Sequence, residues 1–384
     1  MTEQKDTLLT RPSWIEIDLG AIQENAQSIM AHAGAKRLIA VVKADGYGHG
    51  ATPVANALYE IGVRDFAVAT IGEGIKLRQE LAYQDYRIVL LGVQDIAHVD
   101  VMVKYRLSPA IESIDWLSVA LQAIPEGATL DVELAVDTGM GRMGAHSKEA
   151  VYSVYRYIKN NDKLELGGVF THFATADDSN IGYYKQQAQR FNDWVTAAGI
   201  PRQYWHLANS GSALWHTQEI DTRTIRVGSV LYGYNPGAPL LTLPIPLKHV
   251  FALKSRIGAV HQLITGESVS YGATYTAQKP QWVATLPIGY ADGYLRRMAG
   301  MRVLINGKVT YVIGRITMDQ IVIALDQAYP IGTEVTLIGR DGDNEITVEE
   351  FADYANTIPH EILTSFGPRL PRIYKNSLSA VART

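Results

Sequence analysis

Short apolar, β-branched runs alternate with amphipathic segments through the first two hundred or so residues, and this alternation constrains the fold more than any other feature. The amphipathic segments, such as residues 51–62 and 147–160, repeat apolar residues at three- and four-residue spacing, which is typical of helices that bury one face. Parallel strands need helical crossovers, and closing them into a barrel removes the free sheet edges. The runs that we expect to be strands are 37–43, 65–70, 87–92, 107–111, 129–137, 164–173, 204–209 and 224–228. We therefore predict an α/β chain in which residues 12–243 form a (β/α)8 TIM-like barrel.

The pattern changes after residues 232–246, a segment rich in Pro and Gly that we interpret as a linker. Short strand-like runs broken by glycines follow, interrupted by one helix-like segment at 347–358. These features predict a second, mostly β C-terminal domain over residues 244–384. Residues 1–11 could pack on this domain.

Composition and charge exclude several classes of protein. The chain has no cysteine, which rules out disulfides, zinc-thiolate sites and thiol nucleophiles. Its formal net charge of -4 comes from acidic and basic residues mixed along the chain, so we expect no nucleic-acid partner. The first residues lack the apolar core of a signal peptide, and no later apolar run is long enough for a membrane span. We expect a cytoplasmic protein with no metal site and no membrane association.

Polar residues stand where the predicted strands end, which is where barrels of this type carry out chemistry. Burial and neighbouring cations could lower the pKa of Lys43, after the first strand, enough to make its amine a nucleophile that forms Schiff bases. The segments "NSGSA" (209–213) and "RVGS" (226–229) follow the last two strands and supply small residues with free backbone N–H groups, as a phosphate site needs. A Schiff-base lysine opposite a phosphate site suits pyridoxal 5'-phosphate.

Several motifs then occur in the order and spacing of alanine racemases, and the chain resembles this family over essentially its whole length. They are "AVVKADGYGHG", "DTGMGRMG", "THFATAD", "HLANSG", "VSYGATY", "PIGYADGY" and "GRITMDQ". The resemblance implies a homodimer in which each barrel carries pyridoxal phosphate and the β domain completes the active site of the partner subunit. It also implies interconversion of L-alanine and D-alanine, with D-alanine supplied for peptidoglycan.

The same resemblance assigns roles to residues. Lys43 would hold the cofactor as an aldimine and act as one acid/base group, and Tyr271 of the other subunit would be the second in a two-base mechanism. The phosphate would be bound by Tyr47, Ser210, Gly228 and Ser229. The rest of the cofactor would contact His172, His206, Asn209 and Arg226. The substrate would be bound by Arg142, Met318, Asp319 and Tyr290.

Three positions depart from the family pattern. Many members have a carbamylated lysine where this chain has Ala135, so we expect another anion, such as chloride, to hold Arg142. Some relatives have a cysteine at the position of Thr317, and some have a tyrosine near the phosphate at the position of Pro368. We therefore expect resistance to thiol reagents and one phosphate donor fewer.

Alternative functions use the same fold or cofactor. A racemase of serine or of a broader range of amino acids would share every motif above. A pyridoxal-phosphate-dependent amino-acid decarboxylase shares the barrel and β domain, but "VSYGATY" would have no evident use there. A single-barrel cofactor carrier would lack the second domain altogether.

Overall fold

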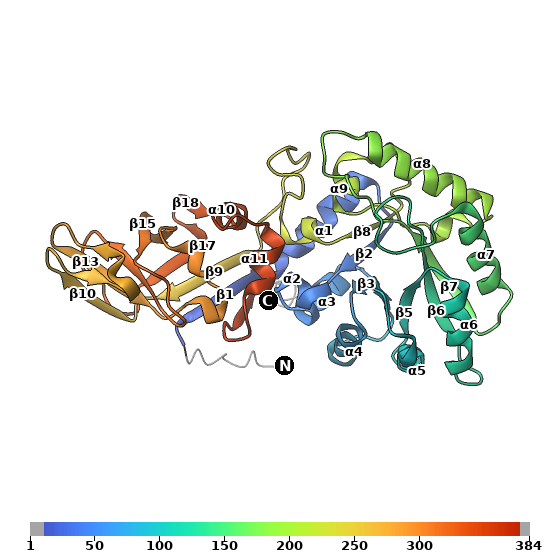
Figure 1. The fold of residues 1–384 in the computed structure, drawn as a ribbon, viewed down its shortest axis with the longest axis horizontal. Helices are drawn as coiled ribbons and strands as arrows, with labels where there is room; N and C mark the ends of the chain where they lie inside the picture. Colours follow the sequence, from blue (N-terminus) through green and yellow to red (C-terminus); the bar gives the residue numbers. More distant parts are fainter. Residues whose placement is uncertain (1–10, 377–384) are drawn as a thin grey trace.

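The structure is a computed structural model that describes residues 11–376, and it contains a strand-and-helix barrel beside an elongated β domain (Figure 1). Seven parallel strands form the barrel sheet in the order β7-β6-β5-β4-β3-β2-β8. They are β2 (Arg37–Val41), β3 (Asp65–Val68), β4 (Arg87–Leu90), β5 (Leu107–Ile111), β6 (Leu130–Ala135), β7 (Leu164–Phe170) and β8 (Thr224–Val227). Each lies inside a run expected to be a strand, so the α/β barrel class is confirmed.

The eighth expected strand, residues 204–209, is not a regular strand. A 3-10 turn, η2 (Arg202–Tyr204), precedes it, and Asn209 already caps the next helix, so only residues 205–208 remain extended. These four residues make one bridge to each neighbouring strand, Val169 to Trp205 and Ala208 to Ile225. The ring is therefore closed between β7 and β8 by single bridges in place of a ladder.

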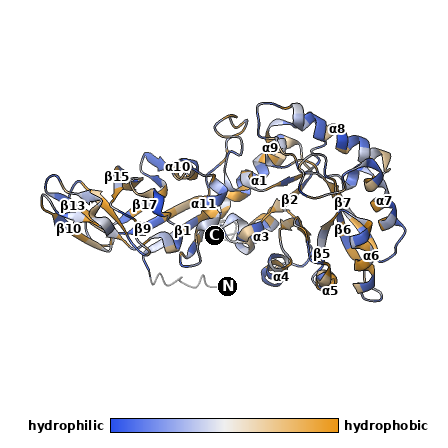
Figure 2. Ribbon diagram, in the orientation of Figure 1, coloured by the Kyte–Doolittle hydropathy of each residue, from blue (hydrophilic) through white to orange (hydrophobic). Residues whose placement is uncertain are grey.

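Helices cover the outside of the barrel, except that residues 43–47, labelled α2 in Figure 1, form a left-handed turn directly after β2. The segments labelled as helices are α1 (Leu19–Ala33), α2 (Lys43–Tyr47), α3 (Ala51–Glu60), α4 (Ile71–Glu80), α5 (Val99–Lys104), α6 (Ile114–Ala123), α7 (Lys148–Lys159), α8 (Gly182–Ala197) and α9 (Ser210–Trp215). Side-chain oxygens of Asp18, Thr70, Ser113 and Ser147 cap four of the helix N-termini, and each accepts a hydrogen bond from an otherwise unpaired backbone N–H. Hydrophilic residues colour much of α7 and α8 in Figure 2, on the side away from the strands. No helix among residues 11–376 combines the length and hydropathy needed to cross a membrane.

The β domain is built on a ten-stranded sheet in the order β10-β13-β16-β15-β14-β17-β9-β1-β19, with β18 beside β17. Its strands are β1 (Ser13–Asp18), β9 (Phe251–Arg256), β10 (Ala259–Leu263), β13 (Gln281–Leu286), β14 (Arg302–Ile305), β15 (Lys308–Ile313), β16 (Ile321–Leu325), β17 (Glu334–Asp341), β18 (Asn344–Ile346) and β19 (Arg372–Lys375). Two short helices, α10 (Val348–Tyr354) and α11 (Pro359–Ser365), replace the single helix-like segment expected at 347–358. Pro359 accounts for the break, because it lacks a backbone N–H and favours the first turn of a new helix.

The first strand, β1, lies in the β domain and not in the barrel. The sequence placed residues from 12 onward in the barrel, but β1 pairs antiparallel with β9 and parallel with β19. Ile15 and Ile17 are fully buried, so the strand contributes to the core. The chain thus enters the barrel only at α1, after passing through the sheet of the other domain.

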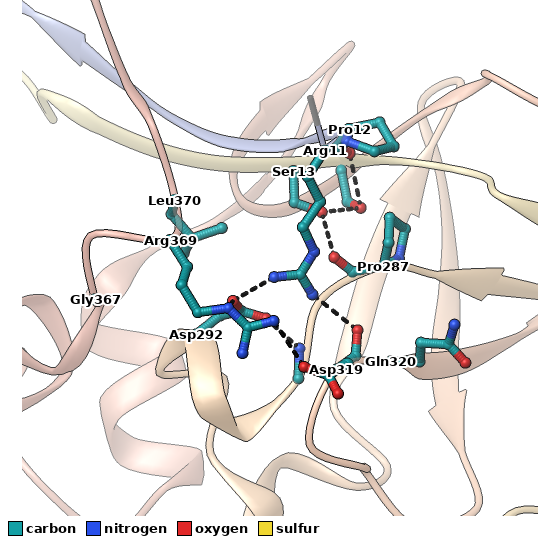
Figure 3. A network of polar contacts seen from close by, with 12 residues as sticks. Arg11, Pro12, Ser13, Pro287, Asp292, Asp319, Gln320, Gly367, Arg369 and Leu370 are labelled. Atoms are coloured by element: carbon teal, nitrogen blue, oxygen red, sulfur yellow. Dashed lines mark hydrogen bonds and ion pairs between the residues drawn. The ribbon is translucent and has the colours of Figure 1, made fainter. Parts of the chain in front are cut away.

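A buried carboxylate, Asp292, joins both ends of the described chain to a turn of the β domain (Figure 3). Its Oδ1 lies 2.5 Å from Arg11 Nη1 and 3.3 Å from Arg369 Nε, and its Oδ2 accepts the Gly289 N–H at 2.8 Å. The Asp292 side chain is fully buried, whereas both arginines are partly exposed. The pairing satisfies the carboxylate without removing the guanidinium groups from water. Arg11 therefore does pack on this domain; residues 1–10 lie outside the described range.

We predict that Asp292→Asn lowers the stability of the folded protein by about 2 kcal/mol, because it leaves two arginines without their shared counter-charge. Asp319→Asn is the matched control, since Asp319 also pairs with Arg369 but is 55% exposed. That change should stay within about 0.5 kcal/mol of the parent protein. Thermal unfolding of the three proteins under one condition measures this difference, and equal losses would contradict it.

Candidate active site

A cavity of about 840 Å³ opens at the C-terminal ends of the barrel strands. Nine of the residues singled out from the sequence line it together: Lys43, Tyr47, Arg142, His172, Asn209, Ser210, Arg226, Gly228 and Ser229. Five others do not line it: His206, Tyr271, Tyr290, Met318 and Asp319. His206 lies buried behind Arg226, and the remaining four belong to the β domain.

Lys43 opens a left-handed turn directly after β2. The backbone φ angles of residues 44–48 are all positive, between 51° and 81°, including those of the non-glycine residues Ala44, Asp45 and Tyr47. Such a conformation costs about 1–2 kcal/mol for each non-glycine residue, so surrounding contacts must hold it. Burial lowers the pKa of Lys43, and Arg142 and Arg226 lower it further, although Glu73 opposes them. The turn therefore fixes Lys43 and Tyr47 in the cavity and favours an uncharged amine.

His49 supports this turn from beneath. Its Nδ1 lies 2.9 Å from the Gly46 carbonyl and 3.0 Å from the Tyr47 carbonyl, so this nitrogen donates. Its Nε2 then accepts the hydroxyl of Tyr234 at 3.1 Å. The ring is fully buried, and burial lowers its pKa to about 4. The only feature of the sequence that could have indicated this role of His49 is its position inside the "DGYGHG" segment.

Small residues form the end of the cavity that suits a phosphate. Ser210 and Ser229 are buried there, and Ser210 Oγ accepts the backbone N–H of Gly228 at 3.2 Å. A Cβ atom at Gly228 would collide with the hydroxyl of Tyr47, so only glycine allows this approach. Burial raises the pKa of Tyr47 to about 12, which keeps that hydroxyl protonated as a donor.

Arg226, on β8, is the most buried cation in the cavity. Its guanidinium donates to the carbonyls of His206 at 2.6 Å and Thr171 at 2.7 Å, and to His206 Nδ1 at 2.9 Å. Burial, reinforced by Arg142 and opposed by Glu133, lowers the pKa of Arg226 to about 10, so it remains charged at neutral pH. Burial and the same two arginines lower the pKa of His172 to about 3. His172 is therefore neutral, 3.5 Å from Arg226.

Two carboxylates hold the loop that carries Arg142. Asp137 accepts the N–H groups of Gly139, Gly141 and Arg142 at 2.9–3.1 Å, and Glu112 accepts that of Gly144 at 2.6 Å. The N–H donors lower the pKa of Asp137 although burial opposes them. The backbone is thus fixed while the Arg142 side chain stays exposed.

Ala135 lies in an apolar cluster at the floor of the cavity. Its neighbours there are Ala110, Phe170, Leu91 and Met143. None of these side chains carries a charge that could hold Arg142. The anion expected beside Arg142 stays a prediction.

Tyr271 projects from a strained turn of the β domain. It opens η4 (Tyr271–Ala273) and is 71% exposed. Ser270, before it, has φ 61° and ψ -177°, a region that only glycine usually occupies, and its hydroxyl donates to the Arg315 carbonyl at 2.5 Å. Strain of this kind persists where contacts impose it, which makes the turn a candidate functional element.

Tyr290 and Met318 lie on two adjoining segments of the same domain. The N–H of Tyr290 donates to the Thr317 carbonyl at 3.1 Å, and that of Ala291 to the Met318 carbonyl at 3.0 Å. Tyr290 is 43% exposed and Met318 is 52% exposed. Asp319, next along, is held by Arg369. These side chains face outward, and none closes the cavity of its own chain.

Comparison with known proteins assigns the two parts of the chain. The family model for the N-terminal domain of alanine racemase matches residues 17–236, and the model for the C-terminal domain matches residues 250–374. This chain belongs to the alanine racemase family. It is therefore an isomerase, and its cofactor is pyridoxal 5'-phosphate, as expected.

Individual relatives agree over nearly the full length. The alanine racemase of Limosilactobacillus fermentum is 42% identical over 372 residues, covering 95% of this chain and 98% of the relative. A crystal structure of alanine racemase from E. faecalis has a TM-score of 0.91 and 39% identity, covering 95% of this chain and 98% of the other. A histidine racemase from Leuconostoc mesenteroides subsp. sake also has a TM-score of 0.91, with 31% identity over 96% of this chain and 99% of the other.

Several residues that line or support this racemase cavity were not found from the sequence. His360, on α11, lines the cavity with its ring centroid 5.5 Å from that of Tyr47, whereas Pro368 is exposed and does not line it. Thr317 has a local role, donating to the Gln320 carbonyl at 2.8 Å. Further such residues are His49, Glu112, Glu133 and Arg87, each of which contacts a segment distant in the sequence.

We predict that His49 makes the folded protein sensitive to mild acid. Its pKa is about 4 when folded and near 6.5 when unfolded, so between these values the unfolded chain binds more protons and stability falls as pH falls. The expected loss between pH 7 and pH 5 is about 2 kcal/mol. His49→Asn, which keeps a donor near the Nδ1 position, should show a smaller decrease in the thermal unfolding midpoint over that range. Exposed His98→Asn is the control and should behave like the parent; identical pH dependence in all three would disprove the assignment.

Proposed function

We propose that this chain interconverts L-alanine and D-alanine with two bases on opposite faces of the substrate Cα, Lys43 of one subunit and Tyr271 of the other. The observation that carries the proposal is that Lys43 and Tyr271 lie apart within one chain. Lys43 lies inside the barrel cavity, while Tyr271 is displayed on the outer surface of the β domain. A single base would return the proton to the face it came from, so inversion needs a second base, and the partner of a homodimer can supply it.

The cavity fits pyridoxal phosphate by its own features. It combines a primary amine of lowered pKa, a glycine pressed against a tyrosine hydroxyl, two buried serines and a buried arginine. When bound, the cofactor supplies an aldehyde for amines and a ring that accepts the electron pair left at Cα.

Each cavity residue then has a defined task. Lys43 binds the cofactor and moves a proton at Cα, and Tyr47, Ser210, Gly228 and Ser229 hold the phosphate. Asn209 and His206 support the ring region that Arg226 faces. Neutral His172 lies beside Arg226, which can only donate, so the proton of its ring is on Nε2 and can be donated to the partner's tyrosine. This hydrogen bond and the positive charge of Arg226 favour the ionised form of that tyrosine.

Substrate selection belongs to the surface that the partner presents. Arg142 binds the substrate carboxylate, as a guanidinium does well. The Met318 backbone, Asp319 and Tyr290 of the partner narrow the entrance and favour a methyl-sized side chain. Alanine is preferred over serine or broader substrates because the similar relatives named above are alanine racemases. We further propose a cytoplasmic role in supplying D-alanine for peptidoglycan.

We predict that, with L-alanine in D2O, the cofactor-loaded enzyme produces D-alanine carrying deuterium at Cα. In Tyr271→Phe, one enantiomer should still exchange its Cα hydrogen while interconversion is lost, because one base remains. Tyr354→Phe, another exposed tyrosine of the β domain, serves as the control and should racemise normally. NMR and optical rotation follow both processes. Release of CO2 without racemisation would favour a decarboxylase instead.

We also predict that two inactive variants complement each other. Lys43→Ala and Tyr271→Phe homodimers should each lack activity, whereas a hybrid dimer has one intact site. Random exchange of subunits should restore roughly a quarter of the parent activity, since half the dimers are hybrids with one working site of two. Differently tagged subunits allow the hybrids to be isolated. Hybrids that form but remain inactive would show that the two residues do not meet in a shared site.

A further inference from the structure

A line of buried charged and polar side chains runs from the cavity down into the barrel. Arg226 donates to His206 Nδ1 at 2.9 Å, and His206 Nε2 lies 2.6 Å from Glu133 Oε2. The other Glu133 oxygen lies 2.5 Å from Arg87 Nη2, and Arg87 Nε lies 2.6 Å from Asp131. Glu133 is fully buried, and Arg226 and His206 are each 3% exposed. Two arginines and two carboxylates thus balance one another around a histidine.

The hydrogen bonds determine where the proton of His206 resides. A guanidinium can only donate, so His206 Nδ1 must accept from Arg226 and the ring proton must be on Nε2. The partner of that proton is the Glu133 carboxylate. Burial opposes ionisation of Glu133, but Arg87 and His206 hold its pKa at about 2. A charge-assisted hydrogen bond therefore ends at a carboxylate that Arg87 keeps in place.

Two adjacent glycines in β7 make room for this line. A Cβ atom on Gly168 would collide with Glu133 Oε2 and lie 2.7 Å from His206 Nε2. A Cβ atom on Gly167 would collide with both Arg87 and Asp131. Glycine weakens a strand interior, so a pair of them marks a close approach of other groups. The pairing of β6 with β7 also shifts register between Val132 and Glu133.

We propose that Glu133, anchored by Arg87, is a positioning residue of this racemase: it fixes the tautomer of His206 and thereby aims the Arg226 guanidinium into the cavity. This inference rests on the proposed function, because Arg226 is taken to face the cofactor ring. Glu133 does not line the cavity and acts on it only through His206. No other carboxylate among the described residues is hydrogen-bonded to that ring.

The test uses the cofactor-loaded enzyme and the proton on His206 Nε2. Hydrogen bonded at 2.6 Å to a carboxylate and buried from water, it should give a far-downfield proton NMR signal that disappears in His206→Gln. Glu133→Gln preserves shape but removes charge, so the signal should move upfield. Glu350→Gln is the matched control, because Glu350 is also paired with an arginine, Arg302, and neither residue lines the cavity. In this control variant, the signal of the His206 Nε2 proton should match that of the parent.

Kinetics provide the second readout. Glu133→Gln should lower kcat on the order of 10-fold, as expected when a group that orients a site residue is lost, while KM for alanine changes less than about twofold because Arg142 is untouched. Gly168→Ala, which disturbs the Glu133–His206 contact without changing either residue, should lose the signal and lower kcat similarly. Gly258→Ala, where a Cβ has only ordinary contacts, should do neither.

The double variant Arg87→Met, Glu133→Gln covers the case in which Glu133→Gln fails to fold, since it removes one charge of each sign. It should show the same upfield signal and lowered kcat. Restoration of parent kcat in this variant would overturn the proposal, because charge balance alone would then suffice. An absent signal in the parent, or one unmoved by Glu133→Gln, would also overturn it. Because the signal does not require turnover, an enzyme that shows it but does not racemise alanine would refute only the proposed function.

Discussion

The burial of Arg226 is the interaction on which the rest of the cavity depends. A guanidinium 3% exposed and surrounded by barrel strands is costly unless every N–H is satisfied and the charge is balanced. Two carbonyls and the Nδ1 of His206 accept hydrogen bonds from the two terminal nitrogens, and Glu133, beyond His206, balances the charge. With the cation fixed, its charge adds to burial in lowering the pKa of His172 and, to a smaller extent, that of Lys43. The protonation states of Lys43 and His172 in the cavity thus depend on the buried contacts that hold Arg226.

Two of the strained backbone segments each present a proposed base. Residues 44–48 form a left-handed turn beside Lys43, and Ser270 has a backbone conformation usual only for glycine directly before Tyr271. The supports differ in kind. His49 holds the first turn from a fully buried position, whereas a hydroxyl-to-carbonyl hydrogen bond to Arg315 holds the second at the surface. The first turn can be rigid by itself, while the second exposes a tyrosine that a partner surface would have to enclose.

The sequence predicted what depends on local pattern. Seven strand positions, the change to a β domain and the nine predicted residues that line the cavity follow from apolar runs, their C-terminal ends and the family motifs. The sequence did not predict the features that depend on contacts between segments far apart in the chain. Residues 204–209 were predicted to form a strand, yet the turns on either side leave only four extended residues. Strand β1 was predicted to lie in the barrel, yet it belongs to a sheet formed mostly by residues beyond 250. Glu133 and His206 are 73 positions apart, so no periodicity links them. The glycine pair at 167–168 was a visible but uninterpreted sign of their contact.

The division between the two domains also explains how one fold can act on different amino acids. A histidine racemase shares this fold with a TM-score of 0.91, so the arrangement of strands alone does not select the substrate. The charged residues of the cavity lie at the ends of barrel strands and contact one another through hydrogen bonds and ion pairs. Replacing one of them therefore leaves its buried partners unpaired and lowers stability. Tyr290 and Met318, in contrast, are exposed side chains on two turns that are joined by backbone hydrogen bonds and by Arg11 and Arg369. Replacing either side chain leaves those bonds intact, so the entrance proposed to select the substrate can change while the buried charges beneath the cavity stay in place.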